Sequence, residues 1–494
     1  MSPNFSPPPV SKRIVLLLFL VSAFSFVYLK HFLNESNPAN RVALCLALLD
    51  NGSVCIDKYY HYSVDHCIRD GHYYCDKAPG VSFLALPFIA AAYHGLQAIG
   101  KTDFTSFDPV RKEEPNPNFK FLLLVGSIPV SLFGALAISM FYALAVRLGA
   151  SQRVAVFGAL LLGFGTPFGV WCTVMFGHAI AGAFLLFATA IGWRLLQTER
   201  PEGCRIAWTV SGFLLAYAVW IEYTAAIPSI IIGCIFLAAM IRKQFTARRI
   251  FPVVCFLGAG AIPVAVGFFL YNTWAFGGPF TLGYQFDTTN FPLMGEGFCG
   301  IKVPRPDVLF QTIFSTKHGI LWYSPILFLS PLLALRNIFR NDKRELNVAC
   351  LLIPLYYYLL NSSYVYWMQS DVPCRHTTAS LPFLVLPLIV GFGTLPPLVR
   401  RLVGALATYS FVMCVVAMNV PGSATLMRAE IKPLFLLREF AGGGIRNLPY
   451  YIGLNPLLTL GVLLVVWGVF SVLLIATVRN VERSSVPDTG SDDL

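Results

Sequence analysis

Runs of mostly apolar residues alternate with short polar connections along nearly the whole of this 494-residue chain. A helix needs roughly 20 such residues to cross a bilayer. The pattern therefore predicts a polytopic, all-α membrane protein. Thirteen candidate spans cover 14–33, 81–99, 120–146, 154–173, 178–196, 206–226, 227–241, 251–271, 318–335, 347–361, 379–398, 402–420 and 456–478.

The first apolar run, 14–33, begins after Lys12 and Arg13 and so starts like a signal peptide. Its apolar core is long, however, and no small-x-small cleavage site follows it. We interpret it as an uncleaved membrane anchor, with a signal peptide as the alternative.

Basic residues decide which connections face the cytoplasm. From run 120–146 onward, every second connection is basic, as the positive-inside rule requires. The alternation holds only if run 81–99, which contains Pro87, His94 and Gln97, lies at the outer interface without crossing. We therefore predict twelve crossings with both termini in the cytoplasm.

This map predicts long polar segments on the outer face, at 34–119, 272–317, 362–378 and 421–455, and short connections inside. We expect residues 1–398 to form a catalytic transmembrane module, 399–481 to add C-terminal helices, and 482–494 to be a disordered cytoplasmic tail.

Composition and charge agree with this map. Hydrophobic residues make up 56% and charged residues 12% of the chain, and the mean hydropathy is +0.66. The net charge of +11 falls on the cytoplasmic side, where we count 19 Lys and Arg against 8 Asp and Glu. The excess charge therefore reports topology, and we expect no nucleic-acid partner.

The first outer loop carries the strongest sign of chemistry. Its turn Lys77-Ala78-Pro79-Gly80 leads directly into the predicted interfacial helix. Free N–H groups at a helix start, together with a lysine just before it, are suited to bind a phosphate at the membrane surface. The alternative is a solvated loop in which these charges have no specific role.

Several stretches resemble bacterial members of the GT-C superfamily, integral membrane glycosyltransferases that include protein O-mannosyltransferases and lipid A aminoarabinose transferases. The resemblance rests on their order along the chain: Asp57, Gly71-His72-Tyr73-Tyr74, Asp76 to Ser82, Phe176-Gly177-His178-Ala179, Glu222-Tyr223, Tyr271-Asn272, Gly283-Tyr284, Gly319 to Pro325, and Trp367 to Arg375. It implies an enzyme that uses polyprenyl-phosphate sugars on the outer face.

Such a reaction needs a carboxylate base for the acceptor hydroxyl and cations for the leaving phosphate. We expect Asp57 as the base, with Asp65 and Glu35 as alternatives, and inversion at the anomeric carbon. Lys77 and Arg375 are the expected phosphate ligands. Further candidates are His72, Asp76, His178, Glu222 and Tyr284.

Structural roles also fit several of these residues. Asp57 could cap a helix or pair with a nearby cation, and Arg375 could anchor its loop at the interface. His178 and Glu222 lie toward the outer ends of spans and could bond to each other across the bundle.

Four cysteines share the first outer loop, and Cys299 and Cys374 lie in two others. We expect disulfides there, since no His/Cys spacing indicates zinc. The resemblance implies metal independence, because relatives with monophosphate donors generally need no metal, whereas those with pyrophosphate donors do. The carboxylates of the outer loops could bind a divalent metal, but no ligand spacing supports one, so we expect a metal-independent enzyme without a cofactor.

The expected partners are a lipid-linked sugar donor, membrane lipids and an acceptor that is a glycolipid, a glycan or a protein. The expected location is a bacterial inner membrane with the site facing the periplasm, or the endoplasmic reticulum membrane in a eukaryote. A transporter or flippase, a lipid-pyrophosphate glycan polymerase or ligase, and a non-catalytic scaffold are the alternatives.

Overall fold

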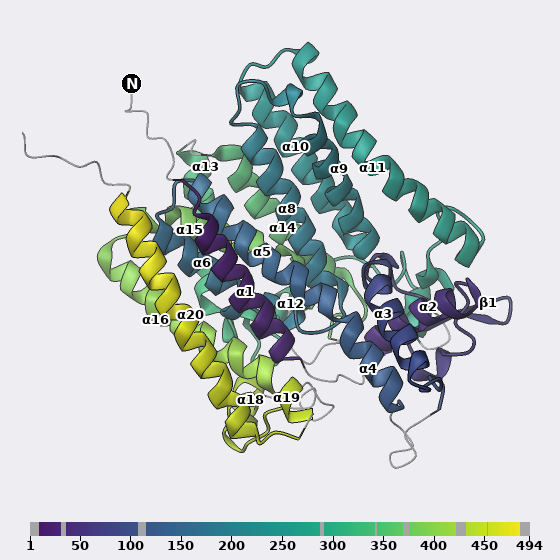
Figure 1. Cartoon of the computed structure of the whole chain (residues 1–494). Helices are drawn as coiled ribbons and strands as arrows, with labels where there is room; N and C mark the ends of the chain where they lie inside the picture. Colours follow the sequence, from purple (N-terminus) through teal and green to yellow (C-terminus); the bar gives the residue numbers. More distant parts are fainter. Residues whose placement is uncertain are drawn as a thin grey trace, which may run out of the picture.

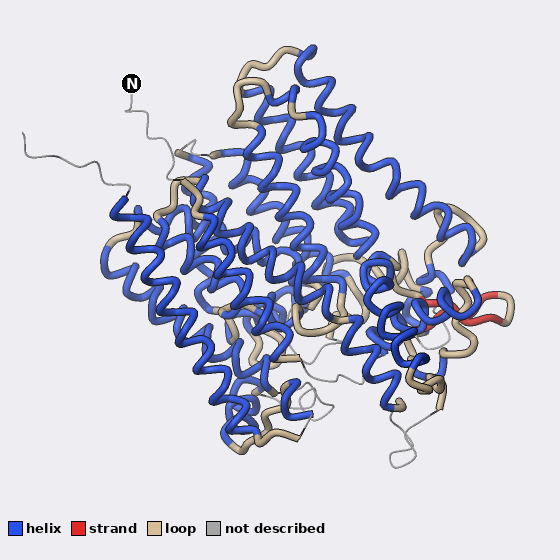
Figure 2. Tube along the Cα trace, in the orientation of Figure 1, coloured by secondary structure: helices blue, strands red, loops and turns tan. Residues whose placement is uncertain are grey.

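The computed structural model of the chain is a bundle of long helices with a smaller layer at one end (Figure 1). It describes residues 9–30, 36–106, 115–286, 291–340, 343–368, 375–420, 431–451 and 453–484. Within them, strands are confined to one short hairpin, shown in red in Figure 2.

The helices follow the apolar runs closely. In the first half of the chain they are α1 (Lys12–Tyr28), α2 (Ser36–Asn51), α3 (Gly80–Ala98), α4 (Pro117–Gly126), α5 (Ile128–Arg147), α6 (Gln152–Phe164), α7 (Pro167–Trp171), α8 (Gly177–Leu195), α9 (Arg205–Ile221) and α10 (Ala226–Arg242). They continue with α11 (Ala247–Phe276), α12 (Pro306–Phe314), α13 (Leu329–Phe339), α14 (Arg344–Ser363), α15 (Leu381–Gly391), α16 (Pro397–Asn419), α18 (Lys432–Ala441), α19 (Leu448–Tyr451) and α20 (Pro456–Ser484).

Eight helices in the described part of the chain are long and apolar enough to cross a membrane, and four more apolar helices are shorter. One of the short helices is α6, which ends at Phe164. Helix α7 follows it, with Pro167 as its first residue and the Thr166 side chain as its N-terminal cap. Helix α8 is buried along most of its length, whereas α11 and α20 expose most of theirs. The apolar exposed faces of α11 and α20 are suited to contact lipid. The chain is an integral, multi-pass membrane protein.

The first and last helices pack against each other. Trp467 Nε1 on α20 donates to Ser25 Oγ on α1 at 2.8 Å, and Tyr28 Oη donates to the Thr459 carbonyl at 2.7 Å. The start of α1 and the end of α20 lie at the same end of the bundle (Figure 1). This is the arrangement that the prediction of both termini on one side requires.

The layer at the opposite end from the start of α1 contains α2, α3 and the hairpin (Figure 1). Strand β1 (His66–Arg69) pairs antiparallel with β2 (His72–Cys75). Asp70 and Gly71 join them with φ angles of 52° and 82°. Asp-Gly is a favoured pair for such a turn, because both positions need positive φ.

Helix α3 corresponds to the run 81–99, begins at Gly80 as the turn 77–80 predicts, and packs against α2 and α4. Its length and composition also suit a membrane crossing. Its interfacial position and the total of twelve crossings stay predictions.

Candidate active site

A cavity of about 670 Å³ lies where the hairpin layer meets the bundle. It draws its lining from segments far apart in the sequence. The polar part of the lining consists of Ser36, Asn37, Asp65, Lys77, His178, Glu222, Tyr223, Thr224, Tyr284, Cys299, Asn361, Tyr364, Arg375 and His376. Six residues selected from the sequence are therefore brought together here: Asp65, Lys77, His178, Glu222, Tyr284 and Arg375.

The hairpin positions Asp65 and Lys77 as neighbours. Asp65 directly precedes β1 and Lys77 follows β2 by two residues, and the register pairs His66 with Cys75. Lys77 Nζ consequently lies 3.5 Å from Asp65 Oδ2. It also donates to the carboxylate of Asp76, which is buried beside it and accepts from Asn40 at 2.9 Å.

Lys77 is a buried but firmly charged group. Burial by itself lowers the pKa of Lys77, but the carboxylates of Asp65 and Asp76 outweigh it and raise the pKa well above its usual value. Its Nζ also lies 5.8 Å from the ring centre of Tyr284. The cavity therefore contains a permanent cation at physiological pH.

Arg41 on α2 does not line the cavity but holds two residues that do, and the sequence did not single it out. Its guanidinium is buried and donates to Asn37 Oδ1 at 2.9 Å, to the Ala78 carbonyl at 2.8 Å and to Glu222 Oε1 at 3.3 Å. It thus connects the turn after Lys77 to the end of α9. An arginine followed at once by the apolar segment 42–49 was the available signal, because a buried arginine needs a partner.

Two glycines allow the backbone to approach Glu222. A Cβ on Gly80 would lie 2.6 Å from the carbonyl carbon of Trp220, and one on Gly177 would lie 2.2 Å from Glu222 Oε1. Real Cβ atoms do not tolerate these distances, so the close contacts require glycine. They hold the starts of α3 and α8 against the end of α9.

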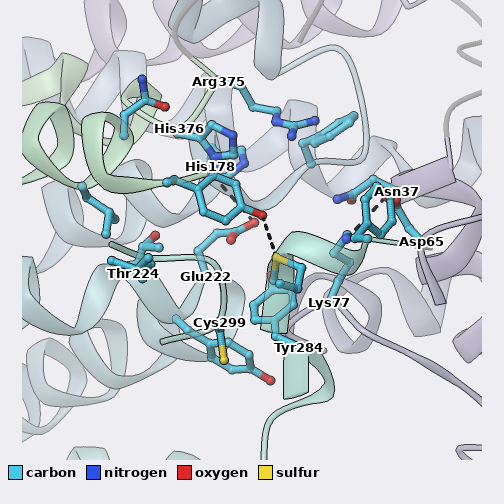
Figure 3. A pocket seen from close by; sticks show the side chains of 18 of the residues that line it. Asn37, Asp65, Lys77, His178, Glu222, Thr224, Tyr284, Cys299, Arg375 and His376 are labelled. Atoms are coloured by element: carbon cyan, nitrogen blue, oxygen red, sulfur yellow. Dashed lines mark hydrogen bonds and ion pairs between the residues drawn. The ribbon is translucent and has the colours of Figure 1, made fainter. Parts of the chain in front are cut away.

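Arg375 and His376 bring further donors to the cavity. Arg375 stacks over Phe176, with its central carbon 5.5 Å from the ring centre, and His376 lies edge-on to His178 at 5.3 Å. Figure 3 shows these groups on one side of Glu222, with Lys77 and Asp65 on another. Arg375 Nε and His376 Nε2 are buried and have no hydrogen-bond partner within the described part of the protein. Such atoms are costly unless a ligand satisfies them.

The other part of the lining is apolar. It comes mainly from the segment 291–301 and from α14, and consists of Val64, Trp171, Phe176, Leu282, Phe291, Met294, Phe298, Ile301, Tyr356 and Leu360. The cavity therefore joins a charged half, suited to an anion, to a half suited to a hydrocarbon or a sugar face.

The remaining candidates lie elsewhere. Asp57 and His72 pair at the turn end of the hairpin, with Asp57 Oδ2 2.6 Å from His72 Nδ1, and neither lines the cavity. Partial burial by itself raises the pKa of Asp57. Hydrogen bonds from the Tyr73 N–H and from His72 outweigh this effect, so the pKa of Asp57 lies below its usual value. Glu35 lies outside the described residues.

The expectation of disulfides in the first outer loop is wrong for three of its cysteines. Cys45, Cys55 and Cys75 are free thiols, and so is Cys299 at the cavity. Burial lets Cys45 and Cys75 behave as small apolar side chains, with Cys45 Sγ 3.3 Å from the Ser82 carbonyl. Cys374 lies outside the described residues.

No protein-family model and no curated protein matches this sequence. Among solved structures, apo ArnT from Cupriavidus metallidurans aligns with a TM-score of 0.51 and 14% identity, over 87% of this chain and 68% of that one. The same protein bound to undecaprenyl phosphate aligns with a TM-score of 0.48 and 12% identity, over 87% and 68%. Archaeal oligosaccharyltransferase AglB from Archaeoglobus fulgidus, in complex with an inhibitory peptide and a dolichol-phosphate, aligns with a TM-score of 0.43 and 14% identity, over 88% and 56%. The alignment with apo ArnT shows a shared fold and confirms the predicted polytopic, all-α, GT-C-like architecture.

Proposed function

We propose that this protein is a membrane glycosyltransferase that moves a sugar from a polyprenyl-phosphate donor to an acceptor hydroxyl. The observation that carries the proposal is the cavity in which Asp65, Lys77 and Arg375 meet beside an apolar wall. The fold shared with ArnT, an aminoarabinose transferase by name, is consistent with it. We propose the outer face as the side of the reaction, because the residues of the cavity lie in or beside the predicted outer segments.

The charged half of the cavity is the proposed phosphate site. Lys77 supplies a permanent charge, and Arg375 and His376 supply the unpartnered donors. A phosphate oxygen would satisfy these buried N–H groups, and charge-assisted bonds of this kind are the strong ones. The same groups would stabilise the charge that grows on the phosphate as it leaves.

Asp65 is the proposed base in place of Asp57. Its side chain lines the cavity, whereas Asp57 is held by His72 and the Tyr73 N–H outside it. In the proposed step the acceptor oxygen attacks the anomeric carbon and loses its proton to Asp65. The bond from that carbon to the phosphate oxygen breaks, and the phosphate keeps the electron pair. A single displacement inverts the anomeric carbon.

The apolar half of the cavity is the proposed place for the first isoprene units or for the face of the sugar. Phe291, Met294 and Phe298 border it from the loop side, and Tyr356 and Leu360 border it from α14. The acceptor is a hydroxyl on a glycolipid, a glycan or a protein, which approaches from the side of Asp65.

The test is release of polyprenyl phosphate from synthetic polyprenyl-phosphate sugars by the purified protein in detergent or nanodiscs. Asp65→Asn should reduce transfer by about 10²–10⁴-fold, the usual contribution of a general base. Asp57→Asn is the matched comparison and should retain most of the activity. Loss of activity in Asp57→Asn alone would return the base assignment to Asp57.

The same assay separates the alternative functions. A transporter or a scaffold would release no lipid phosphate from any donor, and a polymerase or ligase would act on lipid-pyrophosphate donors instead. Activity that depends on added Mg²⁺ or Mn²⁺ would contradict the proposal of metal-independent transfer.

A further inference from the structure

Three side chains of different chemical kinds meet at the turn end of the hairpin, outside the cavity. They are Cys55, Asp57 and His72, whose potential ligand atoms all lie within 4.8 Å of one another. Cys55 and Asp57 are two positions apart, and Asp57 and His72 are fifteen positions apart, which matches no local metal-binding motif. The fold alone brings them together.

Backbone pairing holds these residues in place. Cys55 forms an isolated bridge with Tyr74, and the Ile56 N–H donates to the Tyr73 carbonyl at 2.8 Å. The Tyr73 N–H in turn donates to Asp57 Oδ1 at 2.7 Å. Residues 55–57 therefore lie alongside β2, which begins with His72.

We propose that Cys55, Asp57 and His72 bind a Zn²⁺ ion, with water as the fourth ligand. Thiolate, imidazole and carboxylate are the three ligand types that zinc takes in proteins, at about 2.0–2.3 Å. A site for Ca²⁺ or Mg²⁺ would need several oxygen ligands, and only one carboxylate is present. The mixed ligand set selects a borderline-soft transition metal.

The geometry needs only side-chain adjustment. Ligands of a tetrahedral zinc ion lie about 3.3–3.8 Å apart, given the bond lengths above, and these atoms already lie within 4.8 Å. The side chains of His72 and Asp57 are 58% and 42% exposed, so they can move and an ion can enter from solvent. On binding, the thiol releases its proton to solvent, and His72 binds the ion through Nδ1 with its ring proton on Nε2.

A nucleophilic role suits the cluster less well. The Asp57 carboxylate lies between the thiol and the imidazole and bonds to both. In a cysteine nucleophile the imidazole must instead contact the sulfur to take its proton. The order of the three groups therefore favours a shared cation over proton transfer.

The proposed ion would stabilise the loop and take no part in sugar transfer. Asp65 and Lys77 lie at the open end of the hairpin, four strand residues away, or about 13 Å. The ion would tie residues 55–57 to the turn of the hairpin. The inference does not rest on the proposed glycosyltransferase activity.

The experiment uses the purified full-length protein in detergent, stripped with a chelator and then titrated with Co²⁺ as a spectroscopic probe. We expect one Co²⁺ per chain with a thiolate-to-cobalt charge-transfer band that Zn²⁺ abolishes by displacement. Cys55→Ser should lose the band, and His72→Ala should weaken binding by at least about tenfold. Cys204→Ser, which removes a partly exposed thiol in the connection before α9, should leave the titration unchanged.

A second measurement needs no variant. Saturating Zn²⁺ should slow alkylation of Cys55 in the wild-type chain and leave that of Cys204 unaffected, as followed by mass spectrometry of the labelled peptides. The proposal is overturned if wild-type protein shows no thiolate band, if Cys55→Ser keeps it, or if zinc protects both thiols equally or neither.

Discussion

Arg41→Met removes one partner of the buried ion pair between α2 and α9 and leaves the other in place. The Arg41 side chain is 1% exposed and that of Glu222 is 10% exposed. Methionine fills most of the arginine stem but cannot donate to Asn37, Ala78 or Glu222. The substitution therefore leaves the Glu222 carboxylate buried without its nearest cation.

The expected loss is large. Breaking a buried ion pair by removing one partner costs about 3–5 kcal/mol, mainly because the remaining charge is uncompensated. For 494 residues, an unfolding entropy of about 2.1 cal/mol/K per residue amounts to about 1 kcal/mol/K. The Tm of Arg41→Met should therefore fall by about 3–5 °C.

The assay is thermal unfolding of purified variants in one detergent, followed by tryptophan fluorescence. Arg305→Met is the matched control, because Arg305 pairs with Asp307 at 2.7 Å with both side chains more than half exposed. An exposed pair contributes about 0–1 kcal/mol, so the Tm of this variant should change by less than about 1 °C. A third variant, Arg41→Met with Glu222→Gln, removes both charges and should recover at least about half of the loss.

Either of two results would contradict the expected contribution of the ion pair. A Tm of Arg41→Met within about 1 °C of wild type would mean that the ion pair contributes no more than a surface pair. A double variant that is less stable than Arg41→Met would mean that the unpaired carboxylate is not the source of the loss.

Three further outcomes are expected. Gly80→Ala should lower stability by about 1–3 kcal/mol by overpacking against α9, measured by thermal unfolding, whereas Gly95→Ala, with no atom within 4 Å of the added Cβ, should not. Because the pKa of Lys77 is raised, its favourable contribution is complete below the ordinary lysine pKa of about 10.4 and is lost only above it; polyprenyl-phosphate binding should therefore stay constant from about pH 8 to pH 10, and a decline there would contradict the assignment. In denatured protein without reductant, a thiol-specific label should react fully with Cys45, Cys55 and Cys75. Peptide masses that show any of these three cysteines unlabelled would contradict free thiols there.

The sequence predicted the helices well because a membrane span must satisfy its backbone internally and bury apolar side chains over a fixed length. It predicted the breaks less well. The runs 154–173 and 318–335 look continuous in hydropathy, yet they break near Pro167 and Pro325, where shorter helices begin.

The candidate site was predictable in its residue types but not in its assembly. Lys77, Glu222 and Arg375 stand out because ionisable residues near lipid need a reason to be there. Choosing between Asp57 and Asp65 required the register of the hairpin, which places one beside Lys77 and the other at the turn. The Asp-Gly pair signalled that turn, but the chain gave no local sign of which strand end faces the bundle.

The contact between α1 and α20 has a consequence for how the protein is made. Ser25 and Trp467 bond to each other across 442 positions of sequence. At about 5–20 residues per second of synthesis, the first helix waits roughly 20 to 90 seconds in the membrane before its last partner emerges. During that interval the face of α1 that α20 will cover is open to lipid, to insertion factors or to another nascent chain. Truncation just before α20 should therefore leave the face of α1 that carries Ser25 uncovered, although α5 still packs against the same helix.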